Sequence, residues 1–387
     1  MMQKQIIFLE GTPTVTCFKI AKILRRRGYD TVLISLSNNF DKVFYEGYSK
    51  VISFNLEHLN ILKHPLSTFK NLFKNLRIFK IINHIRKLKP YVIVGVAAPY
   101  PITLSAITLY LSKKIPFIYF PYDVNLLKYN NIENNYILDS IPKIELKSEI
   151  YCLKNADGII FKGDEYKYIK NMLDIKSPVL QFLPYCLKES IVPINKNKLS
   201  KLDGKIHIVY VGRFSKDLYG GMEKILFQKL HLHVYTGQYD LILNSKEHAK
   251  FLNNKYFHLH KPVNQYEICK EISKYDFGFW LSVLDLNIWK KEWIASASGN
   301  KLSTYIEAGV PLIYYKDMAF NHSLIQKYGL GIGVDNNQAN NLKILLKKFN
   351  KKQFLKDIKF ARKDYEMSNN IHKLEEFFDE VIKAKNN

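Results

Sequence analysis

A short segment in the last third of the chain, NKLSTYIEAGVP (300–311), predicts a helix that begins at a lysine among small polar residues. Its apolar residues recur at helical spacing, at Leu302, Tyr305 and Ile306. Gly309 ends this helix, and the apolar run 312–315 behind it predicts a strand. The N-terminus of such a helix can bind an anion such as a diphosphate. An ordinary capped helix of an α/β domain has the same spacing, so the segment alone leaves both interpretations open.

Two basic residues follow the predicted strand 206–211 and are candidates for binding phosphate. Arg213 comes directly after Gly212, and a guanidinium group can hold two phosphate oxygens at once. Lys216 lies three residues further along the chain. The alternatives are a surface arginine at a strand end and a solvated lysine, and for Lys216 the solvated lysine is favoured.

An acidic residue and a glycine turn follow two other predicted strands. Asp123 ends the segment PYD, where its carboxylate could accept a proton from a hydroxyl group, bind a sugar hydroxyl, or instead cap a helix. Gly11 and Thr12 form a tight turn after the first strand, and glycine lets a backbone approach a ligand closely. The turn lacks a GxGxxG pattern, so a dinucleotide-binding fingerprint is not supported.

Histidine and cysteine spacing predicts no metal site. His231 and His233 lie two residues apart on one predicted strand, and His258 and His260 repeat this spacing on or just past another. Each pair shares a strand face and could bind a metal, but no carboxylate or cysteine joins either pair in sequence. The four cysteines lack CxxC spacing, which indicates a reducing compartment.

The bulk composition indicates a two-domain protein with anionic partners. The chain has 387 residues, of which 47% are hydrophobic, so two domains with real cores are expected. Its 58 Lys and Arg against 35 Asp and Glu give a net charge of +23, which attracts polyanions, phosphorylated ligands or an anionic membrane surface. The sequence has no apolar run of about 18 residues, so we expect no transmembrane helix and a cytoplasmic location.

The segment LSTFKNLFKNLRIFKIINHIRKL (66–88) predicts a basic amphipathic helix. Its apolar side is expected to pack on the N-terminal sheet. Its lysines and arginines are expected to contact an anionic surface, which would place the protein peripherally on the inner face of the plasma membrane.

Short apolar runs alternate with helical patterns along the whole chain, which predicts βαβ units and parallel sheets. We therefore predict an α/β fold with two Rossmann-like domains. The expected divisions are an N-terminal domain (1–190), a polar linker (191–205), a C-terminal domain (206–365), and a C-terminal helix (366–387) that packs back on the N-terminal domain. Open sheets bind ligands at the carboxyl ends of their strands, so a cleft between the two domains is expected.

The order of five segments resembles the glycosyltransferases with the GT-B fold, closest to the retaining family 4 group. The segments are IIFLEGTPTVTCFKIAKILRRRGYDTVLIS, PFIYFPYD, ELKSEIYCLKNADGIIFKGDEYKYI, IVYVGRFSKD and GNKLSTYIEAGVPLI. The resemblance covers most of the chain, and it implies that the N-terminal domain (1–190) binds the acceptor and the C-terminal domain (206–365) binds the nucleotide-sugar donor. It implies transfer of a sugar from a nucleotide sugar to a glycan or lipid-linked glycan of the cell envelope. It also implies retention of the anomeric configuration and no metal or cofactor, with the nucleotide sugar as co-substrate.

The resemblance also implies roles for individual residues. Arg213 and Lys301 would stabilise the departing diphosphate, and Asp123 would act on the acceptor. Further contacts to the donor are implied for Gly11, Thr12, Gly212, Lys216, Lys261, Val263, Asn300, Leu302 and Thr304. The family's pair of glutamates, E-x7-E, is replaced here by Ser296 and Thr304. A threonine hydroxyl can still form a hydrogen bond with a hydroxyl of the ligand.

Two other functions remain open at this stage. A sugar-nucleotide epimerase has the same architecture but needs acid and base groups that converge on one sugar, and no matching set of carboxylates and histidines is evident. A nucleic-acid-binding protein would account for the net charge. Because the basic residues are spread along the chain and are not grouped with aromatic residues in a known motif, no specific nucleic acid is expected.

Overall fold

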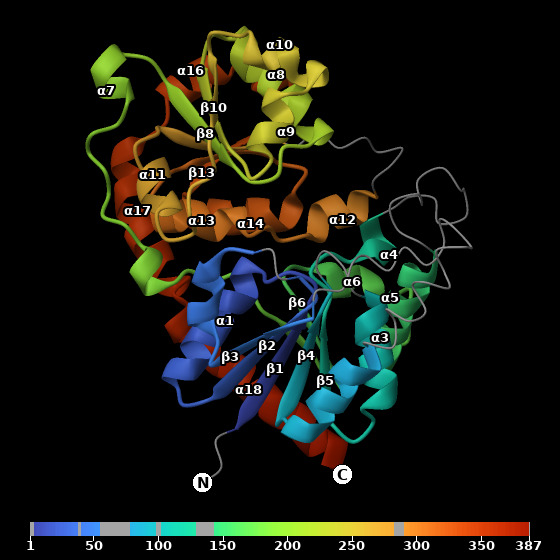
Figure 1. Cartoon of the computed structure of the whole chain (residues 1–387). Helices are drawn as coiled ribbons and strands as arrows, with labels where there is room; N and C mark the ends of the chain where they lie inside the picture. Colours follow the sequence, from blue (N-terminus) through green and yellow to red (C-terminus); the bar gives the residue numbers. More distant parts are fainter. Residues whose placement is uncertain are drawn as a thin grey trace. The chain divides into compact units, whose positions relative to one another are not determined.

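The computed structural model describes residues 4–37, 40–54, 78–97, 102–128, 143–281 and 290–386. The chain divides into two compact units. Unit 1 comprises Met1–Leu183 together with Asn370–Asn387, and unit 2 comprises Pro184–Asn369. Each unit contains one parallel sheet flanked by helices (Figure 1). Two α/β units with parallel sheets are what the alternation of apolar runs predicted.

Unit 1 has a seven-stranded sheet in the order β3-β2-β1-β4-β5-β6-β7, with every neighbouring pair parallel. Its strands are β1 (Gln5–Glu10), β2 (Asp30–Ser35), β3 (Lys50–Ser53), β4 (Val92–Val96), β5 (Phe117–Phe120), β6 (Gly158–Phe161) and β7 (Val179–Gln181). The edge strand β7 was not predicted, because three half-exposed residues carry too little hydrophobic pattern.

The helices of unit 1 cover the sheet, and the last of them comes from the end of the chain. They are α1 (Val15–Arg26), the 3-10 helix η1 (Lys42–Gly47), a helix over residues 78–88, α3 (Ile102–Leu111), α4 (Asn125–Lys128), α5 (Lys143–Asn155), α6 (Glu165–Ile169) and α18 (Met367–Asn386). Figure 1 shows α18 in red against the unit 1 sheet. Gly158 permits this approach, because a Cβ there would lie 2.5 Å from Val381.

Unit 2 has a six-stranded sheet in the order β10-β9-β8-β11-β12-β13, again parallel throughout. Its strands are β8 (His207–Val211), β9 (His231–Tyr235), β10 (Phe257–His260), β11 (Phe277–Trp280), β12 (Leu312–Tyr315) and β13 (Gly331–Val334). In both sheets the strand order reverses beside the first strand, at β1 and at β8. Ligands of such folds bind at the carboxyl ends of the strands at that point.

The helices of unit 2 are short, apart from the last before α18. They are η2 (Lys188–Ser190), α7 (Ser200–Asp203), η3 (Lys216–Leu218), α8 (Tyr219–Phe227), α9 (Tyr239–Leu243), η4 (Lys246–His248), α10 (Ala249–Leu252), α11 (Ile268–Ile272), α12 (Lys291–Ser296), α13 (Lys301–Ala308), α14 (Ala319–Lys327), α15 (Asn336–Ala339), α16 (Leu342–Lys347) and α17 (Lys351–Asp364). One core cluster joins the sheet to α8, α10 and α16 through residues such as Ile208, Met222, Phe251 and Leu346.

The segment 191–205, expected as a linker, belongs to unit 2. The Lys198 ammonium donates to the carbonyl oxygens of Ser273 (2.6 Å) and Tyr275 (2.9 Å), and the Leu199 amide donates to the Lys274 carbonyl. These contacts join the segment to backbone groups that are far away in the sequence. The polar, lysine-rich composition of the segment therefore could not predict them. The unit boundary lies earlier, between Leu183 and Pro184.

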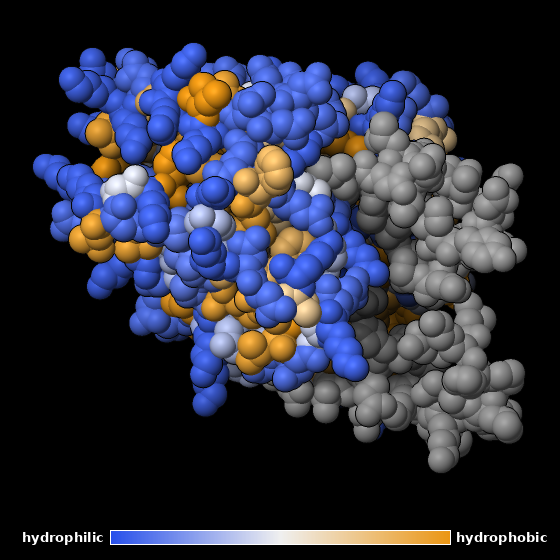
Figure 2. Space-filling model, turned by 90° about the horizontal axis from the view of Figure 1, so that it is seen from above, coloured by the Kyte–Doolittle hydropathy of each residue, from blue (hydrophilic) through white to orange (hydrophobic). Residues whose placement is uncertain are grey.

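Hydrophilic side chains cover most of the face seen from above in Figure 2, with hydrophobic ones in small separate groups. Of the predicted basic helix, residues 66–77 lie outside the described residues. In the part from 78 to 88, the buried residues are Ile78, Ile81, Ile82 and Ile85, and the exposed basic residues are Lys80, Arg86 and Lys87. Among the described helices, none combines the length and the hydrophobicity that a membrane span requires.

Candidate active site

Helix α13 packs against β8 through Tyr305, whose ring lies over a glycine of β11. The Tyr305 hydroxyl donates a 3.0 Å hydrogen bond to the Val209 carbonyl of β8. Its ring lies over Gly278 of β11, where a Cβ would come within 2.5 Å of a ring carbon. Gly309 ends the helix in the left-handed region at φ 65°. Because Lys301 lies four residues before Tyr305, the same helix face carries it toward the carboxyl end of β8.

Lys301 lies between two aromatic rings at the carboxyl ends of β8 and β11. Its ammonium nitrogen is 5.3 Å from the ring centre of Tyr210 and 5.8 Å from that of Trp280. Gly299 makes room for the tryptophan, since a Cβ there would lie 2.6 Å from the indole ring. The rings position a cation at the edge of the sheet where β8 and β11 meet.

The glycine after β8 has a backbone conformation that other residues rarely adopt. Gly212 has φ 138°, and a Cβ there would lie 3.3 Å from both Lys301 Cε and the Tyr210 hydroxyl. That hydroxyl donates a 2.6 Å hydrogen bond to the Arg213 carbonyl, which fixes the turn. The Arg213 side chain is exposed, and within the described part of the chain it forms no ion pair. The structure thus places Lys301 beside Gly212, and Arg213 is the next residue of the chain.

The other basic candidates of unit 2 are more peripheral. Lys216 is 80% exposed and its ammonium lies 3.0 Å from a carboxylate oxygen of Glu247. Lys261 is exposed and Val263 is half-buried, directly after β10. Both residues follow the carboxyl end of β10, just as Arg213 follows the carboxyl end of β8. In the sheet, β9 lies between these two strands.

The first turn of α13 contains the remaining candidates of unit 2. Asn300 makes no side-chain capping hydrogen bond, and its carbonyl instead accepts from the Ser303 hydroxyl at 2.9 Å and the Thr304 hydroxyl at 3.4 Å. Leu302 is buried in the core. Ser296, at the other position of the missing glutamate pair, is buried, and its hydroxyl has no partner among the described residues.

The glutamate closest to this segment in sequence holds the fold together. Glu307 is fully buried and accepts a 2.8 Å hydrogen bond from the Leu187 amide. Its backbone carbonyl accepts from the Val192 amide and from the Arg362 guanidinium. Glu307 therefore ties the segment around residues 187–192 to α13.

In unit 1, Asp123 lies beside two lysines after the end of β5. Its carboxylate is 3.7 Å from the Lys128 ammonium and 4.0 Å from that of Lys162, which follows β6. The Lys162 ammonium is also 3.7 Å from the ring centre of Tyr122. Burial lowers the pKa of Lys162, and the nearby Asp123 carboxylate opposes this effect.

Glu149 binds the backbone amides at the N-terminus of α4. The Glu149 carboxylate accepts from the backbone amides of Asn125 (3.1 Å) and Leu126 (2.8 Å). Burial raises its pKa to about 7 despite these hydrogen bonds. Glu149 is thus a carboxylate that binds a helix N-terminus.

Gly11 and Thr12 follow β1, next to a buried carboxylate. Glu10 accepts 2.8 Å hydrogen bonds from the Thr14 amide and from the Tyr48 hydroxyl. Burial raises the pKa of Glu10 to about 7. The glycine turn therefore lies beside a carboxyl group that changes its charge near neutral pH.

Three charged residues at this edge of unit 1 were not singled out from the sequence. They are Glu10, Lys162 and Glu165, all buried. Glu10 and Lys162 directly follow the apolar runs IIFL and GIIF. A charged residue immediately after a buried strand was a readable signal, because that position lies at the ligand-binding edge of a parallel sheet.

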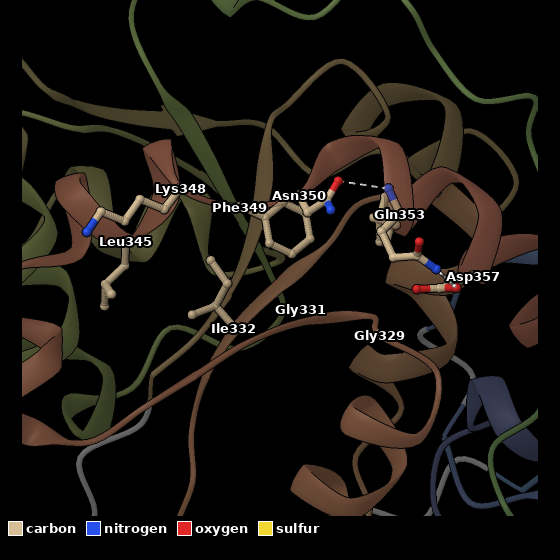
Figure 3. A pocket seen from close by; sticks show the side chains of 10 residues that line it. Gly329, Gly331, Ile332, Leu345, Lys348, Phe349, Asn350, Gln353 and Asp357 are labelled. Carbon is tan, nitrogen blue, oxygen red and sulfur yellow. Dashed lines mark hydrogen bonds between the residues drawn. The ribbon is translucent and has the colours of Figure 1, made fainter.

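A pocket of unit 2 lies away from these residues. It is lined by Ile332, Leu345, Phe349 and Gln353 among others, where α16 and α17 face the start of β13 (Figure 3). The backbone amide of Gln353 donates to the Asn350 side-chain oxygen, as Figure 3 shows, and the Gln353 side-chain amide donates to the Asp357 carboxylate. Because Gly331 is the first residue of β13, the pocket opens at the amino end of that strand, and we do not assign the activity to it.

Two family models match the chain. "Glycosyl transferase 4-like" matches residues 5–159, and "Glucosyltransferase 3-like, C-terminal domain" matches residues 208–374. The first match contains Gly11, Thr12 and Asp123, and the second contains Arg213 and Lys301. No curated protein matches the chain in sequence.

Solved structures share the two-sheet architecture. A sucrose-phosphate synthase from Thermosynechococcus elongatus has a TM-score of 0.70 at 12% identity, covering 99% of this chain and 100% of that one. HepE from Anabaena, in complex with UDP and glucose, has a TM-score of 0.67 at 11% identity (96% and 98% covered). A UDP-GlcNAc 2-epimerase from Methanocaldococcus jannaschii has a TM-score of 0.51 at 16% identity (91% and 94% covered). The predicted GT-B fold is thereby confirmed.

Proposed function

We propose that this chain, a glycosyltransferase with the GT-B fold, transfers a sugar from a nucleotide-sugar donor to a glycan or lipid-linked glycan. Unit 2 binds the donor and unit 1 binds the acceptor. Transfer proceeds without a metal ion and with retention of the anomeric configuration. The chain uses no further cofactor.

The position of Lys301 beside the turn at Gly212 and Arg213 carries this proposal. When the glycosidic bond to the donor breaks, negative charge develops on the diphosphate that leaves. A lysine held by two aromatic rings, an exposed arginine and the first turn of α13 all stand at one edge of the sheet. Preorganised positive groups of this kind stabilise the charge of the transition state, which is the work a metal ion would otherwise do.

We further propose that Asp123 binds the reacting hydroxyl group of the acceptor. Its side chain is 49% exposed, so a ligand can reach it, and the ammonium groups of Lys128 and Lys162 lie 3.7 Å and 4.0 Å from its carboxylate. An ionised carboxylate can orient a sugar hydroxyl or accept its proton. The exposed basic residues of the helix 78–88 support an acceptor at an anionic membrane surface.

Binding of the donor is tested by thermal unfolding with nucleoside diphosphates and nucleotide sugars, UDP and UDP-glucose first. A ligand at a hundred times its Kd stabilises the folded state by about 2.7 kcal/mol, which is a readily measured rise in Tm. We expect Lys301→Met to abolish most of this rise and Lys291→Met, an exposed lysine of α12, to preserve it. If no nucleoside diphosphate or nucleotide sugar raises Tm, the proposal is wrong.

Catalysis is tested with the nucleotide sugar that binds, in the presence of EDTA and a glycan or glycolipid acceptor. We expect transfer to continue in EDTA, and NMR of the product to show the anomeric configuration of the donor. An inverted centre would contradict retention. Epimerised nucleotide sugar formed without any acceptor would favour the sugar-nucleotide epimerase instead.

A further inference from the structure

Five histidines lie on one face of the unit 2 sheet, across three neighbouring strands. They are His207 on β8, His231 and His233 on β9, and His258 and His260 on β10. The parallel register places His207 opposite His231, and His233 opposite His258. Paired residues of neighbouring strands point to the same face. The alternate residues, such as Ile208, Leu232 and Phe257, belong to the core on the other face.

The imidazoles form two hydrogen-bonded rows. In the first row, His207 Nδ1 lies 2.9 Å from His233 Nε2, and His233 Nδ1 lies 2.9 Å from His260 Nε2. In the second row, His231 Nδ1 lies 2.9 Å from His258 Nε2. The rows stack on each other, with ring centres of His233 and His258 4.4 Å apart and those of His207 and His231 4.8 Å apart.

Three of these rings converge on one point. His207, His231 and His233 each offer a ring nitrogen within 4.8 Å of the other two. His207 Nδ1 and His233 Nε2 face each other, and the third candidate nitrogen is His231 Nε2, because Nδ1 of that ring is bonded to His258. His231 Nε2 belongs to a side chain only 9% exposed, and it has no hydrogen-bond partner in the described part of the chain. A buried ring nitrogen without a partner loses its hydration and gains nothing in return, unless a ligand binds it.

The outward nitrogen of each ring is already held. His207 Nε2 lies 3.1 Å from a carboxylate oxygen of Asp203, at the end of α7. His231 Nδ1 is bonded to His258, and His233 Nδ1 to His260. This is the arrangement of metal-binding histidines, whose second nitrogen bonds to a carboxylate or another polar group that fixes the tautomer.

The hydrogen bonds of the outward nitrogens also fix the tautomers that a metal requires. If His233 carries its proton on Nδ1 and donates to His260 Nε2, the lone pair of His233 Nε2 is available to an ion. If His207 carries its proton on Nε2 and donates to the Asp203 carboxylate, the lone pair of His207 Nδ1 is available as well.

We propose that His207, His231 and His233 bind one divalent transition-metal ion of the zinc class. Imidazole nitrogens bind such ions at about 2.0–2.1 Å, which in a tetrahedral site separates the nitrogens by about 3.3 Å. The 2.9 Å pair of His207 and His233 opens by a few tenths of an ångström to admit the ion, and nitrogens that lie up to 4.8 Å apart move closer together. The site has three protein ligands, so water completes the coordination.

This ion has a structural role. His207 and His231 are the first residues of β8 and β9, and His233 is the middle residue of β9, whereas Arg213 comes two residues after the last residue of β8. The three histidines thus lie at the amino ends and middle of the strands, and the candidate donor site lies at the carboxyl ends. The ion cross-links β8 to β9 and is not required for transfer, in agreement with a metal-independent reaction.

The test uses the full chain without a polyhistidine tag, after treatment with EDTA and its removal. Calorimetry with Zn²⁺ alone measures stoichiometry and Kd, and the visible spectrum of the Co²⁺ form reports the coordination geometry. We expect one ion per chain, a rise in Tm with Zn²⁺, and a Co²⁺ spectrum typical of four-coordinate nitrogen ligands. A chain that binds no Zn²⁺, or binds it without a rise in Tm, would overturn the proposal.

Variants locate the site. His231→Ala is expected to weaken Zn²⁺ binding at least tenfold, and His372→Ala, an exposed histidine of α18, to leave it unchanged. If His231→Ala does not fold, the Zn²⁺ affinity of Asp203→Asn tests the site instead, because this substitution alters only a partly exposed partner of His207. We expect it to weaken Zn²⁺ binding about tenfold or more. Equal affinity of the wild type and Asp203→Asn, or of the wild type and a folded His231→Ala, would show that the ion binds elsewhere.

Discussion

The Lys162 ammonium nitrogen lies 3.7 Å from the centre of the Tyr122 ring. Only 4% of the lysine side chain is exposed, and the same nitrogen is 4.0 Å from the Asp123 carboxylate. Burial lowers the pKa of Lys162, while the carboxylate and the ring both favour its charged form. The two side chains therefore lie side by side, and the Asp123 carboxylate opposes the effect of burial on the pKa of Lys162.

The first prediction concerns Asp123. We expect Asp123→Asn to lower kcat a hundredfold or more, because an amide cannot accept the proton of the acceptor hydroxyl. The loss of stability should be small, about 1 kcal/mol or less, since the carboxylate is half exposed. Steady-state kinetics and urea unfolding measure the two effects. Asp174→Asn, which removes an exposed carboxylate paired with Lys176, is the control and should change neither. Equal kcat for the two variants would rule out the assigned role.

The second prediction concerns the turn after β8. Gly212→Ala introduces a Cβ at φ 138°, 3.3 Å from Lys301 Cε, and should cost about 1–3 kcal/mol of stability. It should also raise KM for the donor, because the lysine must move. Gly204→Ala is the matched control, since Gly204 also has positive φ (71°) but a Cβ there meets no atom within 4 Å. It should be destabilised with no change in KM. If both variants keep the wild-type KM, Lys301 does not bind the donor.

The third prediction separates two basic residues that are close in sequence. Arg213 is exposed at the turn, whereas Lys216 is paired with Glu247. Removal of one group that stabilises a developing charge lowers kcat about 10²–10³-fold, and we expect a loss in this range for Arg213→Ala. Lys216→Ala should change kcat by less than about threefold, since a surface ion pair contributes little. A larger loss of kcat in Lys216→Ala than in Arg213→Ala would show that Lys216, and not Arg213, stabilises the diphosphate.

The fourth prediction concerns the pH dependence of stability. Burial raises the pKa of Glu149 from 4.5 to about 7. Between these values the folded state binds more protons than the unfolded state, so the free energy of unfolding falls as the pH rises through 7. In urea unfolding at pH 5 and pH 8, Glu149→Gln should show a smaller fall than the wild type, by up to about 3 kcal/mol. The exposed Glu376→Gln should behave like the wild type. An unchanged fall in Glu149→Gln would show that this carboxyl group is ionised throughout.

Local patterns in the sequence are enough to determine most strands and the fold class. The run FIYF predicts β5, and LIYY predicts β12, because a strand buried on both faces must be apolar throughout. Gly309 predicts the end of α13, since its left-handed conformation favours glycine. The positions of Arg213 and Lys301 could likewise be read from the sequence, because each follows directly from the end of a strand or the start of a helix.

The partners of these residues depend on the tertiary structure. Sequence spacing predicts that His231 and His233 share one strand face. Only the register of the parallel strands places His207, which lies 24 residues earlier in the chain, opposite His231. Lys162 and Asp123 are likewise joined because β5 and β6 are neighbours in the sheet. Hydrophobic periodicity reports which face of an element is buried, and it contains no information about which element lies beside it. Those contacts form between residues far apart in the chain, and they are settled when the sheets assemble.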